Sequence, residues 1–339
     1  MNRLWQGITT TQFFLYGKKS FTQSGYYNHL KSYTSPVQTA AVITDESQSD
    51  GVDLTGKTVV VTGANSGIGK EIATYAAAKH ANVYMICRNA ERAETAKRDI
   101  VSSTNNNNVQ ILLGDVSEPS HIQRIVREFG EDKLDVLVCN AGALFKERRV
   151  NSEGKEVTLM SHLVCGSYQL TKLLMPKLKQ SNEGKVIYVS SGGMYNSRFP
   201  SWEEAASIGE YETKYDGQFA YTYAKRGQVL LAERFAKLYT DVTFVSCHPG
   251  WTMTSGVEAA YGDDAKYLKP LRTTWEGSEG ICWLMSAPAK NLKSGEFYLD
   301  REVQRKHIGG LFMSEGGFTK NSEKDVDTMI ERFEKEVGV

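Results

Sequence analysis

Four tyrosines in this chain are each followed by a lysine four positions later, a spacing that on a helix places phenol and ammonium about one turn apart. A phenol can give a proton to a forming alkoxide when neighbouring positive charge lowers its pKa from the usual value of about 10. The pairs are Tyr27/Lys31, Tyr75/Lys79, Tyr168/Lys172 and Tyr221/Lys225. The spacing therefore indicates acid–base chemistry without identifying the pair that performs it.

A glycine-rich segment is a second and more specific pattern. Residues 62–69 read Thr-Gly-Ala-Asn-Ser-Gly-Ile-Gly, directly after an apolar run and at the start of a helix-like stretch. Glycines let a backbone turn sharply and approach a pyrophosphate, and a helix N-terminus attracts that anion. The setting predicts a dinucleotide site formed by Gly63, Asn65, Ser66, Gly67, Ile68 and Gly69.

The elements that must carry these patterns begin near Gly51, where short apolar runs alternate with stretches of helical spacing. The predicted strands cover residues 59–61, 83–86, 111–113, 136–138, 186–189, 242–245 and 295–299. Strands that alternate with helices predict right-handed βαβ units. The expected fold class is α/β, a doubly wound parallel sheet of the Rossmann type with helices on both faces.

We expect one domain with an appendage at each end. The chain of 339 residues is long enough to bury a sizeable core. Residues 1–52 are expected to form an N-terminal extension packed on or tethering the domain, 53–318 the Rossmann-type domain, and 319–339 a C-terminal amphipathic helix.

Composition limits the partners and the compartment. Forty basic residues balance forty acidic ones, so no overall field favours nucleic acid or an anionic bilayer. The five cysteines are scattered and none has C-x-x-C spacing, which favours buried free thiols and no metal site. The expected location is the cytoplasm or another reducing compartment. No run approaches the roughly 18 apolar residues of a membrane-spanning helix.

Residues 1–44 contain basic side chains such as Arg3 and Lys18 and no acidic one, along with several aromatic residues. This composition suits a clamp packed on the domain, a foot that contacts a membrane surface, or a removable presequence. A mitochondrial presequence would normally carry more arginine, so the clamp is favoured.

The spacing T-G-x-x-x-G-I-G at residues 62–69 resembles the short-chain dehydrogenase/reductase family. Four further segments follow in the order that this family shows: Asp115-Val116, Asn140-Ala141-Gly142, Ser190-Ser191, and Pro249-Gly250-Trp251 with Thr254. The resemblance implies that the first segment meets the adenine ring and that the second lines the cofactor. It also implies that the last touches the nicotinamide carboxamide.

The resemblance also selects one tyrosine. Only Tyr221 follows the strand that ends in serine and precedes an apolar helix, so the other three are expected to be solvated or core-facing. By this resemblance, Tyr221 is the acid/base, Lys225 supplies positive charge and binds the nicotinamide ribose, and Ser191 holds the substrate oxygen. The implied activity is an oxidoreductase that interconverts a carbonyl and an alcohol by hydride transfer.

The substrate is expected to be a small lipophilic molecule. The insert between Ser191 and Tyr221 contains Trp202 and Tyr211, which are expected to shape its pocket. The alternative function is an NADP(H)-binding regulatory or scaffold protein with little or no turnover, because a fold does not guarantee an activity. A sugar-nucleotide epimerase is disfavoured, since those relatives usually carry T-G-x-x-G-x-x-G.

One departure from the family supports that alternative. Many members carry a helix-borne asparagine that completes a proton relay with the tyrosine and lysine. The corresponding stretch here is Ser161-His162-Leu163-Val164-Cys165, which contains none. Whether Ser161 or His162 takes its place stays open.

The end of the second predicted strand indicates which cofactor is bound. An acidic residue there would bind the 2′-hydroxyl of NAD(H), whereas this chain has Cys87-Arg88-Asn89. Arg88 can pair with a 2′-phosphate, which favours NADP(H) over NAD(H).

The oligomeric state also stays open. Many relatives pair through the helices that correspond to those holding Tyr168 and Tyr221, but a C-terminal helix would cover one such surface.

Overall fold

The computed structural model describes residues 3–33, 50–254, 257, 262–308 and 315–339. These residues contain a sheet in the order β3-β2-β1-β4-β5-β6-β7-β8, parallel throughout except for the last pair. The strands are β1 Thr58–Thr62, β2 Asn82–Cys87, β3 Val109–Leu113, β4 Val136–Cys139, β5 Lys185–Val189, β6 Thr243–Cys247, β7 Phe297–Leu299 and β8 Glu302–Gln304. The strand order reverses between β1 and β4, so the predicted doubly wound α/β fold is confirmed.

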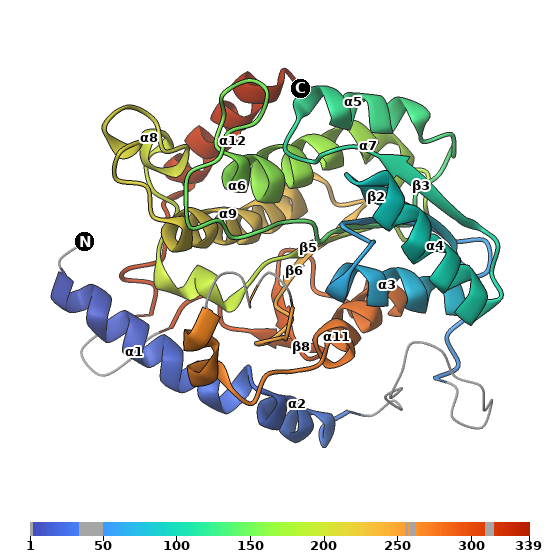
Figure 1. Ribbon diagram of the computed structural model, residues 1–339, viewed down its shortest axis with the longest axis horizontal. Helices are drawn as coiled ribbons and strands as arrows, with labels where there is room; N and C mark the ends of the chain where they lie inside the picture. The colour runs from blue at the N-terminus through green and yellow to red at the C-terminus, as the bar shows by residue number, and fades with distance from the viewer. Residues whose placement is uncertain (1–2, 34–49, 255–256, 258–261, 309–314) are drawn as a thin grey trace.

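Helices cover both faces of the sheet (Figure 1). One layer contains α3 Gly67–Ala78, α4 Ala90–Thr104 and α11 Thr274–Ser286. The other contains α5 Pro119–Glu128, α7 Leu170–Leu178, α9 Gly217–Leu238 and α12 Glu323–Val337. Successive side chains of β1 point to opposite faces of the sheet, as in any pleated strand. Val59 and Val61 pack against the first helix layer, and Val60 packs against the second.

Shorter elements connect these layers. They are α6 Val157–Leu159, the π-helix η2 Met160–Gln169, η3 Gly192–Asn196, α8 Trp202–Ala205, η4 Gly209–Tyr211, η5 Gly262–Leu268 and η6 Ala289–Asn291. The π-helix runs between α6 and α7 and is buried along its whole length. Because π-turns inside helices often mark functional positions, η2 is important for the site described below.

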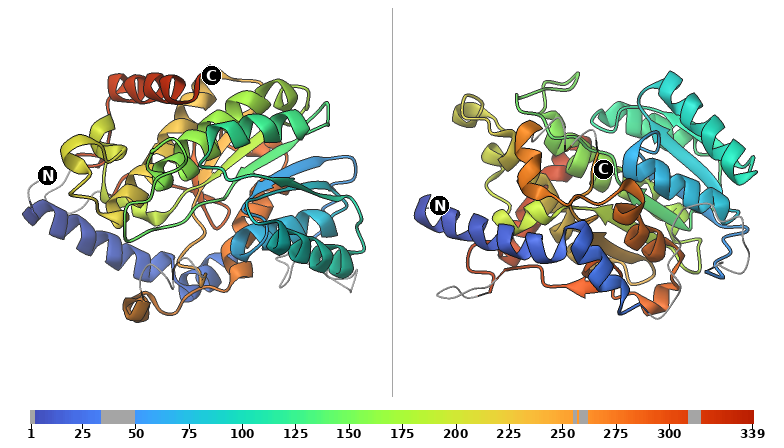
Figure 2. Two further views of the ribbon diagram at one scale, coloured as in Figure 1. Left: turned by 45° about the horizontal axis from the view of Figure 1, so that its top comes forward. Right: turned by 60° about the horizontal axis from the view of Figure 1, so that its bottom comes forward.

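The N-terminal helices α1 Arg3–Ser20 and α2 Gln23–Leu30 lie along one side of the domain (Figures 1 and 2). Phe21, between them, is 1% exposed and belongs to an apolar cluster with Tyr195 and Phe297. Its backbone is also fixed, since the Phe21 carbonyl accepts hydrogen bonds from Trp251 N at 2.7 Å and from Arg272 Nε at 2.9 Å. The described part of the extension therefore packs on the domain as a clamp would.

At the other end, α12 occupies residues 323–337. Ser322 and Asp325 form a capping box at its start. Phe333 is fully buried and its ring centroid lies 5.5 Å from that of Tyr168. The helix therefore covers the part of η2 that holds Tyr168.

The end of the sheet differs from the sequence expectation, because the antiparallel strand β8 follows β7 after two residues. The turn residues Asp300 and Arg301 have φ of 50° and 70°, which disfavours most side chains other than glycine. Asp300 nevertheless adopts it because its carboxylate accepts two hydrogen bonds from the buried guanidinium of Arg272, at 2.5 and 2.7 Å. Without glycine or asparagine in the turn, the sequence offered no hairpin signal.

Candidate active site

A single cavity of about 450 Å³ at the carboxyl ends of the strands brings together all of the predicted site residues. They are Gly63, Asn65, Ser66, Gly67, Ile68, Gly69, Arg88, Asp115, Val116, Asn140, Ala141, Gly142, Ser191, Tyr221, Lys225, Pro249, Gly250 and Thr254. They come from the loops after the six parallel strands β1 to β6 and from α3 and α9. The location agrees with the rule that ligands of open α/β sheets bind beyond the strand ends, where the order reverses.

The glycine turn between β1 and α3 is suited to a phosphate. Gly63 has φ of 68°, and a Cβ atom there would lie 3.1 Å from the Ala141 Cα. A Cβ atom on Gly69 would lie 2.3 Å from the Gly63 carbonyl oxygen, so the helix can approach the turn only without a side chain. Ser66, at the N-cap of α3, makes no side-chain capping hydrogen bond. The first turn of α3 lines the cavity, and its N–H groups and dipole fit the pyrophosphate of a dinucleotide.

The loop after β4 is tied to β1 by hydrogen bonds through one threonine. The Thr62 hydroxyl accepts from the backbone N–H groups of Asn140 at 2.9 Å and Ala141 at 2.8 Å. The Asn140 side-chain amide donates to the Thr62 carbonyl at 3.0 Å. These contacts fix one wall of the cavity against the glycine turn.

Arg88 lies just beyond β2, at the same end of the cavity as Asp115. Its guanidinium Nη1 is 3.8 Å from the Asp115 carboxylate, and its side chain is 68% exposed. Asp115 is oriented by hydrogen bonds that its Oδ1 accepts from the Ser117 N–H at 2.9 Å and hydroxyl at 2.7 Å. Arg88 thus presents its permanent charge to the cavity from a strand end, while the acidic residue beside it lies on the next loop.

Tyr221 and Lys225 lie one turn apart on α9, whose start is capped by Asp216. The Lys225 side-chain nitrogen lies 5.5 Å from the centre of the Tyr221 ring. It donates to the Val189 carbonyl at 2.7 Å and to the Gln228 side-chain oxygen at 3.2 Å. Burial in the cavity floor lowers the pKa of Lys225 to about 7. The lysine can therefore change its charge near neutral pH, directly beneath the phenol ring.

Ser191 ends the loop after β5 and lies beside the tyrosine. A Cβ atom on Gly193 would lie 3.6 Å from the Ser191 hydroxyl oxygen and 3.7 Å from Cε1 of Tyr221. The adjacent Ser190 hydroxyl donates to the Lys225 backbone carbonyl at 2.7 Å, which joins the strand end to α9. The hydroxyl of Ser191, the phenol of Tyr221 and the amine of Lys225 therefore share one end of the cavity.

The helix position where relatives carry asparagine contains Ser161 and His162, which both line the cavity. The Ser161 hydroxyl donates to the Thr158 carbonyl at 3.4 Å, within its own helical turn. The His162 ring stands perpendicular to the Tyr221 ring at 5.2 Å and donates from Nε2 to the Ala143 carbonyl at 3.0 Å. Burial, together with the charge of Lys225, lowers the pKa of His162 well below its ordinary value. His162 is therefore neutral near pH 7.

The loop after β6 is held by residues that sequence reasoning did not connect with the site. Trp251 lines the cavity, and its ring packs against Phe13, Phe14 and Phe21 of the N-terminal segment. A Cβ atom on Gly17 of α1 would lie 2.3 Å from the Trp251 ring. The N-terminal helices thus hold the loop that carries Pro249, Gly250 and Thr254. No local pattern signals such contacts, because they join residues more than 200 positions apart.

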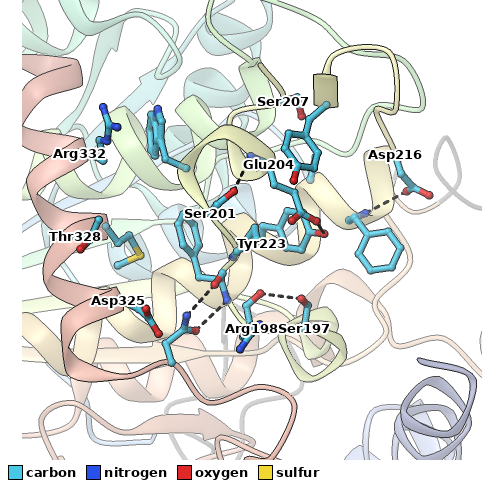
Figure 3. A pocket seen from close by; sticks show the side chains of 18 of the residues that line it. Ser197, Arg198, Ser201, Glu204, Ser207, Asp216, Tyr223, Asp325, Thr328 and Arg332 are labelled. Atoms are coloured by element: carbon cyan, nitrogen blue, oxygen red, sulfur yellow. Dashed lines mark hydrogen bonds between the residues drawn. The ribbon is translucent and has the colours of Figure 1, made fainter. Parts of the chain in front are cut away.

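A second cavity, of about 850 Å³, lies beside the start of α9, and Figure 3 shows Asp216 and Tyr223 among its lining residues. Trp202 and Tyr211 line this cavity and do not line the one that contains Tyr221, so the structure does not place them where the sequence analysis expected. In the wall of this second cavity, the Tyr223 hydroxyl donates to the Glu204 carboxylate at 2.7 Å. The apolar residues that line the cavity of Tyr221 include Leu144, Phe145, Val157, Trp251 and Leu268.

No helix among the described residues is long and apolar enough to cross a membrane. No cluster of three or more histidine, cysteine or acidic side chains in that part of the chain could hold a metal ion.

Comparison with known proteins places the fold and cavity in a family. Residues 57–202 match the family model for short chain dehydrogenases. The chain is 33% identical over 298 residues to dehydrogenase/reductase SDR family member 12 of Bos taurus, covering 87% of this chain and 89% of that protein. The chain belongs to the short-chain dehydrogenase/reductase family of oxidoreductases, which confirms the resemblance seen in its motifs.

Other relatives share less of the chain. Retinol dehydrogenase 12 of Bos taurus is 32% identical over 257 residues, which cover 74% of this chain and 79% of that protein. A solved short chain dehydrogenase of Escherichia coli CFT073, complexed with NADPH, has a TM-score of 0.58 and 21% identity, covering 74% of this chain and 98% of that one. The structural likeness shows the shared fold.

Proposed function

We propose that the protein is an NADP(H)-dependent oxidoreductase that interconverts a carbonyl and an alcohol, with Tyr221 as its acid/base. The observation that carries the proposal is the placement of Tyr221 over the buried Lys225, beside Ser191, in the cavity that also contains the glycine turn. A bound nicotinamide cofactor would supply or accept the hydride.

The side chains of the site would then transfer the proton and stabilise the negative charge that forms during the reaction. In the reductive direction, the carbonyl oxygen gains negative charge as the hydride reaches carbon, and the Tyr221 hydroxyl gives it a proton. The ammonium of Lys225 stabilises the phenolate that remains, since the two groups are close in a cavity largely shielded from water. The Ser191 hydroxyl can donate to the same substrate oxygen and hold it next to Tyr221.

NADP(H) is proposed because of Arg88. Its mostly exposed guanidinium lies at the cavity end formed by β2 and the Asp115 loop, where the family places the adenosine. A 2′-phosphate there would gain a charge-assisted hydrogen bond with a planar fork of donors. The solved E. coli relative in complex with NADPH shares this fold.

The substrate is proposed to be a small lipophilic carbonyl or alcohol. The same cavity is lined by Leu144, Phe145 and Leu268, which suit an apolar molecule. The name of the relative retinol dehydrogenase 12 agrees with this class. A reducing compartment is proposed because the described cysteines are all buried free thiols.

The direct test incubates the purified protein with NADPH and a panel of aliphatic, aromatic and steroid-like aldehydes and ketones, following the loss of NADPH absorbance. Turnover that requires both NADPH and a lipophilic carbonyl would support the proposal. Tight NADPH binding without turnover of any carbonyl or, with NADP⁺, any alcohol would instead support a nucleotide-binding regulatory protein. The specific observation in favour of that second function is the stretch 161–165, which contains no asparagine where the family's relay residue is expected.

A further inference from the structure

The relay that the family builds on an asparagine needs a different partner in this chain. Neither Ser161 nor His162 provides it, because the Ser161 hydroxyl bonds within its own turn and the His162 ring bonds to Ala143. Among the hydrogen bonds of the described residues, neither of these side chains reaches Lys225. The contact to Lys225 comes instead from Gln228, three residues further along α9.

Gln228 connects the lysine to η2. Its side chain is 1% exposed, and its oxygen accepts from the Lys225 amine at 3.2 Å. Its Nε2 donates to the His162 backbone carbonyl at 2.9 Å and to the Ser167 hydroxyl oxygen at 3.0 Å. A carbonyl can only accept, so the amide nitrogen must face His162 and the amide oxygen must face Lys225. The orientation of the amide is therefore set by its partners.

The other titratable groups around Lys225 carry no charge near neutral pH. Cys139 on β4 and Cys247 on β6 face it from the sheet, and burial raises the pKa of both thiols to about 12. His162 on η2 is neutral, and Tyr221 lies on α9 itself. The charge on the amine is thus stabilised by dipoles: the Val189 carbonyl and the Gln228 amide oxygen.

We propose that Gln228 is a positioning residue that holds the Lys225 ammonium beneath Tyr221 and links it to the His162 carbonyl of η2. The inference rests on the proposed function for its catalytic consequence. Its structural core is independent of turnover: the amide oxygen of Gln228 favours the protonated form of Lys225. Removing that oxygen should lower the pKa of Lys225, and replacing the amide with a carboxylate should raise it.

Two variants of nearly unchanged side-chain size separate this role from a packing role. Gln228→Met removes the acceptor, while Ser167 still donates to the His162 carbonyl at 2.5 Å. Gln228→Glu supplies a negative partner at the same place. The Lys225 pKa is measured on cofactor-free protein by trace acetylation with acetic anhydride as a function of pH, quantified by mass spectrometry of the Lys225 peptide. Gln228→Met should lower it by about one pH unit. Gln228→Glu should raise it by about one to three.

The matched control is Gln169→Met. Gln169 lies on η2 and is also buried, and its side-chain amide donates a hydrogen bond to the Pro119 carbonyl at 3.3 Å. It does not line the cavity. Gln169→Met should leave the Lys225 labelling curve unchanged.

In turnover assays, kcat/KM for NADPH-dependent reduction should decline on the alkaline side at a pH that follows the Lys225 pKa. This pH should be lower in Gln228→Met and higher in Gln228→Glu than in wild type.

Shifts of opposite sign in the two variants would support the positioning role, since a merely structural glutamine would give loss of stability without opposite titration shifts. An unchanged labelling curve, or a shift of the same sign in both, would overturn it. If one Gln228 variant does not fold, the direction of the Lys225 pKa shift in the other, compared with Gln169→Met, still tests the proposal. A wild-type protein that binds NADPH but shows no turnover would remove the proposed activity, while the labelling experiment would still decide the role of Gln228.

Discussion

Lys225 is 3% exposed yet carries an ionisable amine, and its place beneath the Tyr221 ring gives the phenol its proposed role. A buried amine is costly to charge, so its two carbonyl acceptors matter more than they would at the surface. At this scale the side chains around the cavity make distinct predictions for proton transfer and for cofactor choice.

Tyr221→Phe should retain NADPH binding and lower kcat by about 10²- to 10⁴-fold, because the ring stays and only the proton donor is removed. Tyr223→Phe is a matched control, since Tyr223 lies two residues further on α9, where its hydroxyl bonds to Glu204 in the second cavity. Steady-state rates and fluorescence titrations of NADPH on both variants check this. Full turnover by Tyr221→Phe would contradict the assignment.

Arg88→Asp should weaken NADPH binding by about ten- to a hundredfold, because a charge-assisted hydrogen bond contributes about 1.5–3 kcal/mol. It should bind NADH as well as or better than wild type, since a carboxylate can accept from the 2′-hydroxyl. Arg98→Asp, an exposed change on α4 outside the cavity, controls for net charge. If wild type binds NADH as tightly as NADPH, Arg88 does not select the cofactor.

At the scale of elements, α9 and η2 form the floor of the site, and their contact depends on polar side chains inside an apolar layer. Gln228 and Ser167 both bond to the His162 carbonyl, where the helix is π-helical. The same burial that orients Lys225 also makes it a source of pH-dependent stability.

Lys225 should contribute an increase in the free energy of unfolding of the cofactor-free protein between pH 7 and pH 9. The pKa of Lys225 is about 7 in the folded state and about 10.4 when unfolded, so between these values the unfolded chain binds more protons. The contribution of Lys225 to the free energy of unfolding therefore increases with pH across that window. Between pH 7 and pH 9, Lys225→Met should change the free energy of unfolding less favourably than wild type does, by roughly 2 kcal/mol.

Urea unfolding of wild type and Lys225→Met at both pH values measures this difference. Lys185, whose pKa burial lowers to about 8, contributes with the same sign, and the buried thiols, whose pKa burial raises, contribute with the opposite sign. The test is therefore the difference between Lys225→Met and wild type. The same change of stability between the two pH values in both proteins would mean that Lys225 keeps its ordinary pKa in the fold.

At the scale of the whole molecule, the N-terminal helices and the sheet domain meet at the cofactor loop. The Phe21 carbonyl joins α1 and α2 to Trp251, and the buried Arg272 joins the same carbonyl to Asp300 in the β7–β8 turn. Packing of the extension and the geometry of the site are therefore connected.

Deletion of residues 1–44 should lower the melting temperature by about 5–15 °C, since it exposes the partners of the buried Phe21 and Tyr26 side chains. NADPH affinity should fall as well, because the loop around Trp251 loses its support. Phe21→Ala should reproduce part of both effects, whereas Leu15→Ala, at a position 64% exposed, should reproduce neither. A truncated protein with the melting temperature and NADPH affinity of the full chain would favour a removable presequence.

The sequence by itself determined the fold class and many of the residues that line the cavity. The glycine turn at 62–69 and the strands with their β-branched runs are local features, so residue type and spacing identify them. Among four Tyr–Lys pairs, the order of the segments selected Tyr221, which the structure places with the glycine turn. The other tyrosines divide as expected, Tyr27 being 52% exposed and Tyr168 fully buried.

Tertiary structure decided the features that depend on contacts distant along the chain or on burial. The β7–β8 turn exists because Arg272 pairs with Asp300, and the cofactor loop is held because Phe21 reaches Trp251. Gln228 gave a weak local signal, as a polar residue before the apolar run Val229-Leu230-Leu231, but its partners lie on η2 and α9. A side-chain amide has no preferred partner until the fold excludes water and leaves the Lys225 amine, the His162 carbonyl and the Ser167 hydroxyl to satisfy it.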